Sequence, residues 1–217
     1  FYFITVASDE GKRIDVHPTV EGSYPVIQQY DDYMYHESDE RNLLGSGREW
    51  YGERFNFDEQ RKFSFEVGNI VPNSPVKMVS DVVGQSYGPS SYNLFWNGTA
   101  LPEQEISPIP NTQYGIKGVH KRDTMILNSD DVNASSITTQ VITYQFNRAA
   151  TGASAGFLDF FLINIKRKLA LYGHQTLFRS YESLSQPVRT FNVSDVNVNC
   201  SIWNITRPDW PSRVGYT

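Results

Sequence analysis

Cys200 is the first residue to consider for covalent chemistry, because a thiolate is the strongest nucleophile among protein side chains. It is the only cysteine in the chain. The segment that starts at Val196 predicts a strand in which Cys200 shares one face with Val198 and Ile202. The thiol is therefore expected to be buried and inert. No histidine is close to it in sequence, so a structural cysteine is favoured over a catalytic one.

The histidines offer little metal or base chemistry. They are scattered through the chain without the close spacing that zinc sites use. A role as a metal ligand or as an activating base is disfavoured for each of them: His17, His36, His120 and His174.

Carboxylates form two clusters. One is an acidic segment that contains Asp31, Asp32, Glu37, Asp39 and Glu40. The other is the pair Asp130 and Asp131, in an expected loop, which is the weak candidate for calcium. Neither cluster has the spacing of a defined calcium loop, so a solvated acidic face is favoured, and no metal or cofactor is expected. A carboxylate pair for glycoside hydrolysis stays open, because its geometry depends on the fold.

Large aromatic side chains could instead stack on sugars. Packing in a β core is the favoured interpretation for this set: Trp50, Tyr51, Trp96, Trp203 and Trp210. Trp203 is the exception. It is expected on the strand face opposite Cys200, among Asn and Ser, where it would contact another layer or domain.

The elements that position these residues are expected to be strands. Residues 156–169 join an apolar run to strict alternation, and residues 137–147 also alternate. The small residues of 151–155 between them favour a hairpin, so the two segments are predicted to form a central strand pair. A helix over 157–169 is disfavoured by the β-branched and aromatic content.

Other segments complete the pattern. Asn97-Gly98 predicts a tight hairpin turn, and residues 101–112, with three prolines, predict a loop or an edge segment. Pro25, Ile27, Tyr30 and Met34 favour a short helix over 25–37, with an extended linker as the alternative. Strands are further expected at 1–7, 63–67, 76–83, 92–96, 113–119, 123–128, 176–179, 189–195 and 196–205.

This count predicts an all-β fold: a two-sheet β-sandwich, jelly-roll-like, with at most the short helix. The 217 residues suffice for one substantial core. We expect residues 1–44 to form a strand and an acidic linker or helix that packs on the sandwich. Residues 45–205 would form the sandwich, and 206–217 a connector toward a downstream domain.

Composition excludes several classes of function. The net charge is −5 and basic residues are scattered, so no nucleic-acid groove is expected. The longest apolar stretch, 157–165, contains Asp159 and Asn164, so no membrane span is expected. The chain begins at Phe1 within an expected strand, so we expect it to be a piece of a longer, extracytoplasmic protein.

Four segments of the sequence carry a resemblance to a known family. The run Ser46-Gly-Arg-Glu-Trp-Tyr-Gly-Glu-Arg-Phe resembles the Ser-Gly-Arg-x-Trp-x-Gly-Glu-x-Phe signature that precedes the catalytic domain in the PorU family. These are gingipain-like cysteine peptidases that act as sortases of the type IX secretion system. Three further segments are similar to later parts of the same region: Gly156-Phe-Leu-Asp-Phe through Leu169, Gln175-x-Leu-Phe-Arg, and Ile202-Trp-Asn-Ile-Thr-Arg-Pro-Asp-Trp-Pro.

The resemblance implies a role without catalysis for this chain. Such sortases remove the C-terminal sorting domain of secreted cargo at the outer-membrane surface of Gram-negative bacteria and anchor the product there. Their catalytic His and Cys belong to a downstream α/β domain, so no catalytic residue is carried over. The implied partners are that peptidase domain, secretion-system components and cargo. The alternative function is a carbohydrate-binding β-sandwich module of a secreted protein.

The residues expected to mediate contacts lie mainly in the Gly-rich motif. Charged side chains there surround aromatic anchors, as in many interdomain contacts. A corner that joins two edges of the sandwich would use the same residues. The candidates for binding or interdomain contact are Arg48, Glu49, Trp50, Glu53, Arg54, Phe55 and Trp203.

Overall fold

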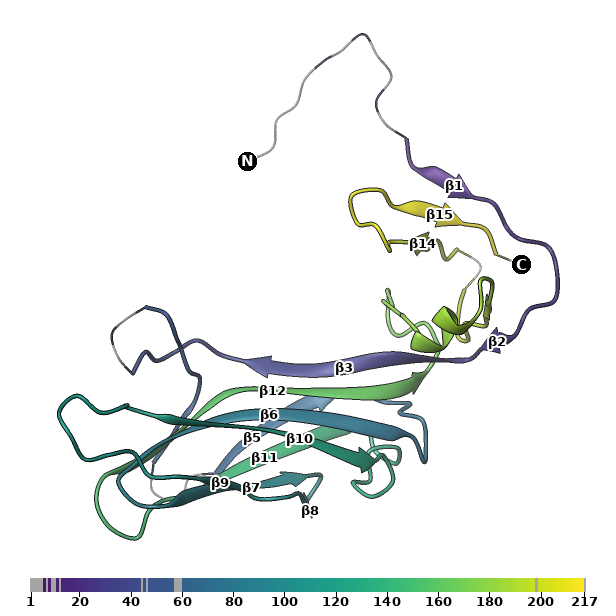
Figure 1. The fold of residues 1–217 in the computed structure, drawn as a ribbon. Helices are drawn as coiled ribbons and strands as arrows, with labels where there is room; N and C mark the ends of the chain where they lie inside the picture. The colour runs from purple at the N-terminus through teal and green to yellow at the C-terminus, as the bar shows by residue number, and fades with distance from the viewer. Residues whose placement is uncertain are drawn as a thin grey trace.

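The structure is a computed structural model that describes residues 6, 8, 11, 13–43, 45, 47–56, 60–197 and 199–216. Two multi-stranded sheets pack face to face (Figure 1), which confirms the predicted all-β sandwich. The long sheet has the order β10 (Val119–Asn128), β6 (Pro75–Ser86), β12 (Ser154–Lys168) and β3 (Gln29–Glu37), with β4 (Arg54–Phe55) also paired to β12. The short sheet has the order β5 (Gln60–Glu66), β11 (Thr139–Asn147), β7 (Ser90–Trp96) and β8 (Thr99–Ala100), with β9 (Gln104–Ile106) paired to β7.

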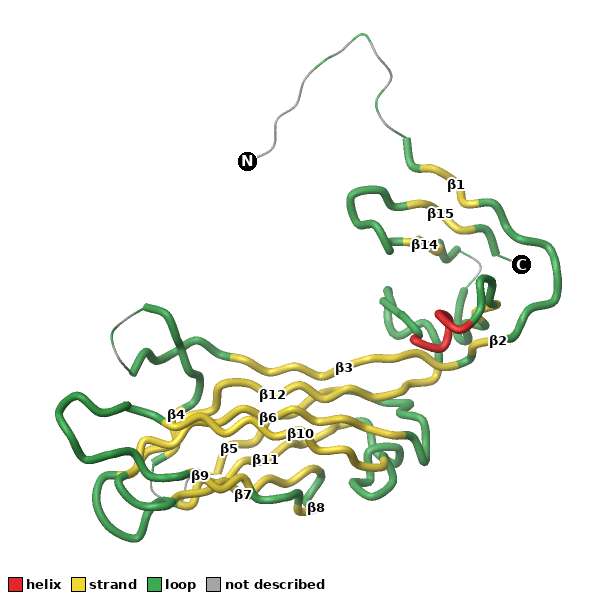
Figure 2. The backbone as a smooth tube through the Cα atoms, in the orientation of Figure 1, coloured by secondary structure: helices red, strands yellow, loops and turns green. Residues whose placement is uncertain are grey.

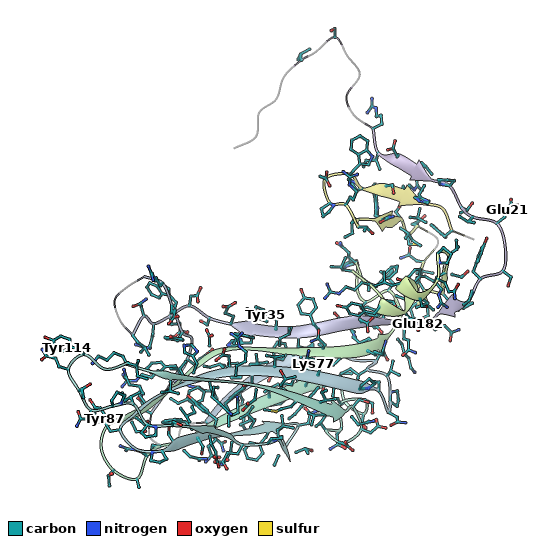
Figure 3. The ribbon with its side chains drawn as sticks, viewed as in Figure 1. Glu21, Tyr35, Lys77, Tyr87, Tyr114 and Glu182 are labelled. Carbon is teal, nitrogen blue, oxygen red and sulfur yellow. The ribbon has the colours of Figure 1, made fainter. Side chains whose placement is uncertain are left out.

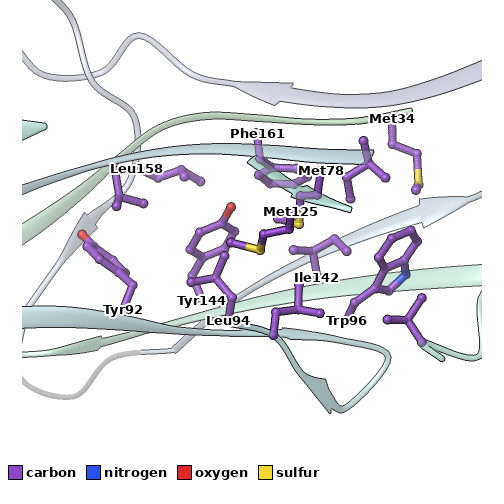
Figure 4. Close-up of a cluster of buried hydrophobic side chains, with 14 of the residues drawn as sticks. Met34, Met78, Tyr92, Leu94, Trp96, Met125, Ile142, Tyr144, Leu158 and Phe161 are labelled. Carbon is purple, nitrogen blue, oxygen red and sulfur yellow. The ribbon is translucent and has the colours of Figure 1, made fainter. Parts of the chain in front are cut away.

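The core lies between the two sheets (Figure 4). Along β6, Val76, Met78 and Val82 point inward in alternation, while Lys77 lies on the outer face. Aromatic rings fill much of the space between the sheets. The largest of the fully buried side chains is Trp96, at the end of β7.

The predicted central strand pair is wrong. β11 and β12 do not pair with each other: β11 pairs with β5 and β7, whereas β12 pairs with β6, β3 and β4. Residues 148–153 cross from one sheet to the other. Both strands carry an apolar face, so the two segments satisfy that pattern equally well by facing each other across the core.

The short helix predicted over 25–37 is also wrong. These residues form β2 (Val26–Ile27) and β3. Tyr30 and Met34 are buried on one face of β3, and a spacing of four places two residues on one face in a strand as well as in a helix. Antiparallel pairing with β12 along nine residues decides for the strand.

The tight turn at Asn97-Gly98 is confirmed. Both residues have positive φ, 50° and 84°, and they join β7 to β8. β10 begins at Val119, so residues 113–118 are a loop and only the later of the two predicted strands forms. The strand predicted over 1–7 lies almost entirely outside the described residues.

Peripheral elements lie at the β2 end of the long sheet (Figure 2). β1 (Asp15–His17), β15 (Ser212–Val214) and β14 (Ile202–Asn204) form a small sheet, and β13 (Thr190–Phe191) pairs with β2. A 3-10 helix, η1, spans Tyr181–Ser185. Residues 176–179 form no strand. In the described part of the chain, no helix has the length and apolar character needed to cross a membrane.

Candidate functional site

The covering loop, which comprises the described residues 38–43, 45 and 47–53 between β3 and β4, folds over the outer face of the long sheet. Tyr51 is buried there against Val83, Ala155 and Phe157. The loop closes on itself through two backbone hydrogen bonds: Arg41 N donates to Tyr51 O at 2.8 Å, and Tyr51 N donates to Arg41 O at 2.7 Å. The described residues of the family-like motif, 47–55, are therefore part of a structured element that rests on the sheet.

A series of polar contacts fixes the covering loop to β10 and β6. The Tyr51 hydroxyl lies 2.9 Å from His120 Nε2 and also donates to Glu49 Oε2 at 2.9 Å. His120 Nδ1 lies 3.3 Å from Asp81 Oδ1. Arg122 Nε donates to Asp81 Oδ2 at 2.6 Å. The carboxylate of Asp81, whose residue is only 2% exposed, thus has a partner on each oxygen.

The electrostatics of these polar contacts favour a charged Asp81–His120 pair. Burial pushes the pKa of Asp81 upward, but hydrogen bonds from His120 and Arg122 outweigh burial and hold that pKa below its ordinary value. The hydrogen bond to Asp81 raises the pKa of His120 against the opposing effect of burial. A protonated His120 would donate from Nε2 to the Tyr51 hydroxyl, which leaves that hydroxyl free to donate to Glu49.

A β-bulge adds a second carboxylate beside these polar contacts. The pairing of β12 with β6 shifts between Leu158 and Phe160, so Asp159 is the extra residue. Ligand atoms of Asp81, His120 and Asp159 lie within 4.8 Å of one another. Burial, and then the negative charge of Asp81, raise the pKa of Asp159. Both Asp81 oxygens already accept hydrogen bonds from His120 and Arg122, so the geometry describes an internal ion pair with a second carboxylate beside it.

Two of the predicted contact residues, Glu53 and Phe55, point inward or along the sheet. Phe55 is fully buried, with its ring edge-on to Tyr92 at 5.2 Å between centroids. Glu53 Oε1 lies 2.8 Å from His36 Nε2. Burial raises the pKa of Glu53, but the hydrogen bond to His36 and other nearby groups hold it below its usual value. Glu49 is exposed, and its carboxylate accepts the hydrogen bond from the Tyr51 hydroxyl described above.

The other predicted contact residues point to solvent. Trp50 is 44% exposed, and Arg48 and Arg54 are exposed beside it in the chain. Arg54 also lines a surface cavity of about 420 Å³ at the end of the sandwich. Trp203, 46% exposed, belongs to β14 in the small sheet and so is separate from the motif. The sequence prediction of buried tryptophans holds for Trp96 alone.

The weak calcium candidates lie in the loop after β10. Asp130 accepts hydrogen bonds from Ser135 Oγ at 2.6 Å and from Asn73 N at 3.0 Å. These hydrogen bonds lower the pKa of Asp130. Asp131 is exposed. The Asp130 carboxylate therefore stabilises a loop between β10 and β11.

The expected burial of Cys200 on a strand is wrong. β14 begins only at Ile202, and Cys200 lies before it in a turn, with intermediate exposure. Cys200 N donates to Asn197 O at 3.2 Å, and Asn199 N donates to the Asn197 side chain at 3.0 Å. An Asn that turns the backbone locally competes with strand formation. Among the described residues, no histidine contacts Cys200; His36 and His120 have the partners given above.

Sequence reasoning did not identify Asp81, His120 and Arg122. Two signals were available. Asp81 interrupts an apolar segment between Val79 and Val83, and a charge within such a segment needs a partner. His120 and Arg122 are two residues apart, so in a strand they share one face.

Comparisons with known proteins bear on the fold. No protein-family model matches this sequence, and no curated protein matches it. The crystal structure of dimeric latent PorU from Porphyromonas gingivalis superposes with a TM-score of 0.74 at 20% identity, over 93% of this chain. The chain has a PorU-like fold. It spans 19% of the length of that PorU chain, and at this identity the likeness extends to the fold alone.

Carbohydrate-binding modules match less well. A CBM36 module in complex with calcium and xylotriose gives a TM-score of 0.35 at 10% identity, over 62% of this chain and 98% of that one. The CBM36-1 domain of a multidomain xylanase from the hindgut metagenome of Trinervitermes trinervoides gives 0.37 at 9% identity, over 68% and 99%. Scores this low carry no argument about ligands.

Proposed function

We propose that this chain is a non-catalytic β-sandwich module of a gingipain-like sortase of the type IX secretion system. The observation that carries the proposal is the PorU-like fold over 93% of the chain, together with the PorU-like motif in the covering loop. In this role the module would precede a cysteine peptidase domain and position it at the outer-membrane surface. The residues 206–217 would be the connector.

The motif residues of the covering loop point in two directions: some anchor the loop on the sheet and others face solvent. This arrangement supports a positioning role. Gly52 is held tightly: a Cβ there would lie 2.9 Å from Ser38 O and 3.2 Å from Leu158 O. Tyr51 and Phe55 anchor the loop and β4 from within. Trp50 then faces solvent beside Arg48, an aromatic side chain with a charged neighbour, as in many interdomain contacts.

The first test is the reading frame that encodes this chain. The proposal expects a His- and Cys-bearing α/β domain after residue 217, and a frame without one would contradict it. The isolated chain should also show no thiol-dependent cleavage of a cargo sorting-domain peptide. Cleavage that is lost in Cys200→Ser would refute the non-catalytic assignment.

The second test concerns the contact itself. Binding of this chain to the separately produced downstream domain would be measured by calorimetry. Trp50→Ala should weaken binding at least about tenfold, since a central aromatic anchor often contributes 1.4 kcal/mol or more. Tyr114→Ala is the control, since it removes an exposed aromatic side chain from the loop before β10 that is not among the contact candidates. Equal loss in both variants would argue against the covering loop as the contact.

A carbohydrate-binding module is the second candidate, favoured by one observation. Tyr33 and Tyr35 are 48% and 45% exposed and lie on one face of β3, so they could stack on sugar rings. A glycan array followed by titration would test it. Saturable binding that Tyr33→Ala and Tyr35→Ala abolish would support this function over the first, and no saturable binding to any glycan would exclude it.

A further inference from the structure

β3 is the last strand of the long sheet, so one of its edges has no neighbouring strand in the order that the described residues form. Leu169 N donates to Gln28 O, and this hydrogen bond fixes which residues of β3 direct their backbone groups to β12. The even-numbered residues direct their backbone groups to β12, and the odd-numbered residues direct theirs to the other edge. Asp31 confirms this, because its N donates away from β12, to Arg179 O at 2.8 Å.

The chain itself covers only the beginning of this edge. Arg179 accepts from Asp31 N, and its guanidinium lies 5.2 Å from the centre of the Tyr33 ring. Tyr181 N donates to Asp31 Oδ2 at 2.7 Å, and η1 then leads the chain away. Beyond this point, no other described segment pairs with the backbone of residues 33–37, and Tyr33 N donates to Asp32 Oδ1 at 2.9 Å. Arg179 therefore places a backbone acceptor and a basic side chain at the beginning of this edge.

The uncovered part of the edge is aromatic and acidic. Tyr35 faces away from the sandwich (Figure 3), and its hydroxyl donates to Glu37. The hydrogen bond to Glu37, burial, and the negative charges of Glu37, Asp159 and Asp39 raise the pKa of Tyr35 to about 12. The salt bridges among the described residues include none with Glu37, Asp39 or Asp159. Glu37 and Asp39 therefore give the end of β3 a local negative charge that no salt bridge among the described residues neutralises.

We propose that the free edge of β3, residues 33–37, binds an extended basic peptide segment by strand addition. Backbone hydrogen bonds to Tyr35 and Glu37 and to the Tyr33 carbonyl would supply affinity, and Lys or Arg side chains near Glu37 and Asp39 would supply specificity. Pairing of two copies through this edge is disfavoured, since it would add the negative charge of the second copy to that of the first. This inference does not depend on the parent protein proposed above.

The test uses a fluorescent peptide of alternating valine and lysine and, as its counterpart, one of alternating valine and glutamate. Binding to the whole chain is measured by fluorescence anisotropy. We expect saturable binding of the lysine peptide, at least about tenfold tighter than that of the glutamate peptide. The affinity should fall as salt is raised, because charge pairs contribute to it.

Two variants separate the backbone from the charges. Tyr35→Pro removes an N–H that faces the open edge and leaves the β12 hydrogen bonds in place, so it should weaken binding at least about tenfold. The double variant Glu37→Gln/Asp39→Asn should weaken it severalfold and reduce its salt dependence. Glu105→Gln, an exposed acid of β9 in the other sheet, is the matched charge control and should bind as the unmodified chain does.

Three results would overturn the proposal. The first is the absence of saturable binding to the lysine peptide, and the second is equal affinity for both peptides. The third is a dimer in solution that Tyr35→Pro dissociates, which would make a second copy the occupant. If Tyr35→Pro fails to fold, the charge variant decides: unchanged binding in Glu37→Gln/Asp39→Asn overturns the proposed basic partner.

Discussion

The rings of Tyr144 and Phe161 lie 5.7 Å apart between centroids in the centre of the core. They come from β11 and β12, strands that follow each other in sequence but belong to opposite sheets. The Tyr144 hydroxyl continues across the core and donates to Ser80 Oγ of β6 at 2.7 Å. Ser80 Oγ in turn donates to Gln104 Oε1 at 2.7 Å, so a short buried network joins both sheets.

This network predicts an order of stabilities. Tyr144→Phe keeps the ring and removes one donor, while Ser80 still donates to Gln104, so the loss should be about 1 kcal/mol. Ser80→Ala leaves the buried Tyr144 hydroxyl and the Gln104 carbonyl without a partner and should cost about 2–3 kcal/mol. Urea denaturation measures both values. A larger loss in Tyr144→Phe than in Ser80→Ala would contradict the network.

The fold class could be predicted from the sequence because alternation and turn chemistry are local. Asn97-Gly98 sets its own turn, and β6 alternates over its first half. Strand partners are not local. The segments 137–147 and 156–169 have the patterns of a hairpin, yet the crossing of residues 148–153 between sheets depends on the other strands that each segment finds.

The candidate site was only partly predictable for the same reason. The motif indicated that Trp50, Glu53 and Phe55 matter together, but Trp50 faces solvent and Phe55 the core. The partners that fix the covering loop come from β6 and β10. His120 acquires its role only because β10 pairs with β6 in a register that brings it next to Asp81, and no spacing in the sequence records that register.

Gly156 of β12 is predicted to tolerate no side chain. A Cβ there would lie 2.7 Å from Phe146 Cδ2 and closer still to the Tyr92 hydroxyl oxygen. Both rings are fully buried, so Gly156→Ala should lower the free energy of unfolding by about 1–3 kcal/mol. Gly11→Ala is the control, because a Cβ at Gly11 meets nothing within 4 Å. Equal stability of the two variants in urea denaturation would contradict the packing.

Arg167 is predicted to resist replacement by lysine. Its Nη1 donates to Asp32 Oδ2 at 2.8 Å and its Nε to Gly68 O at 2.8 Å, while its guanidinium lies 4.0 Å from the centre of the Tyr172 ring. Lysine cannot reproduce this planar set of contacts, so Arg167→Lys should cost about 1.5–3 kcal/mol.

Arg207→Lys provides the comparison for this prediction. Arg207 pairs with Asp209 where both side chains are about three-quarters exposed, 73% and 72%. Exposed pairs contribute little, so the change should lie within about 0.5 kcal/mol. Thermal denaturation of both variants gives the measurement, and a similar Tm for Arg167→Lys and the unmodified chain would show that the Arg167 contacts add no stability.

The contact between Asp81 and His120 predicts how stability changes with pH. The pKa of His120 is raised in the folded state, so its stabilising effect is complete below the unfolded pKa of about 6.5 and is lost as pH rises through the folded value. The pKa of Asp81 is lowered, so its effect is present above about 3.9 and is lost as pH falls through its folded value. His120→Gln should therefore flatten the decline in Tm that begins above about pH 6.5. His174→Gln, which alters an exposed histidine in the turn after β12, should keep that decline. If both variants follow the unmodified chain across this range, His120 does not carry the charge that holds the covering loop to the sheet.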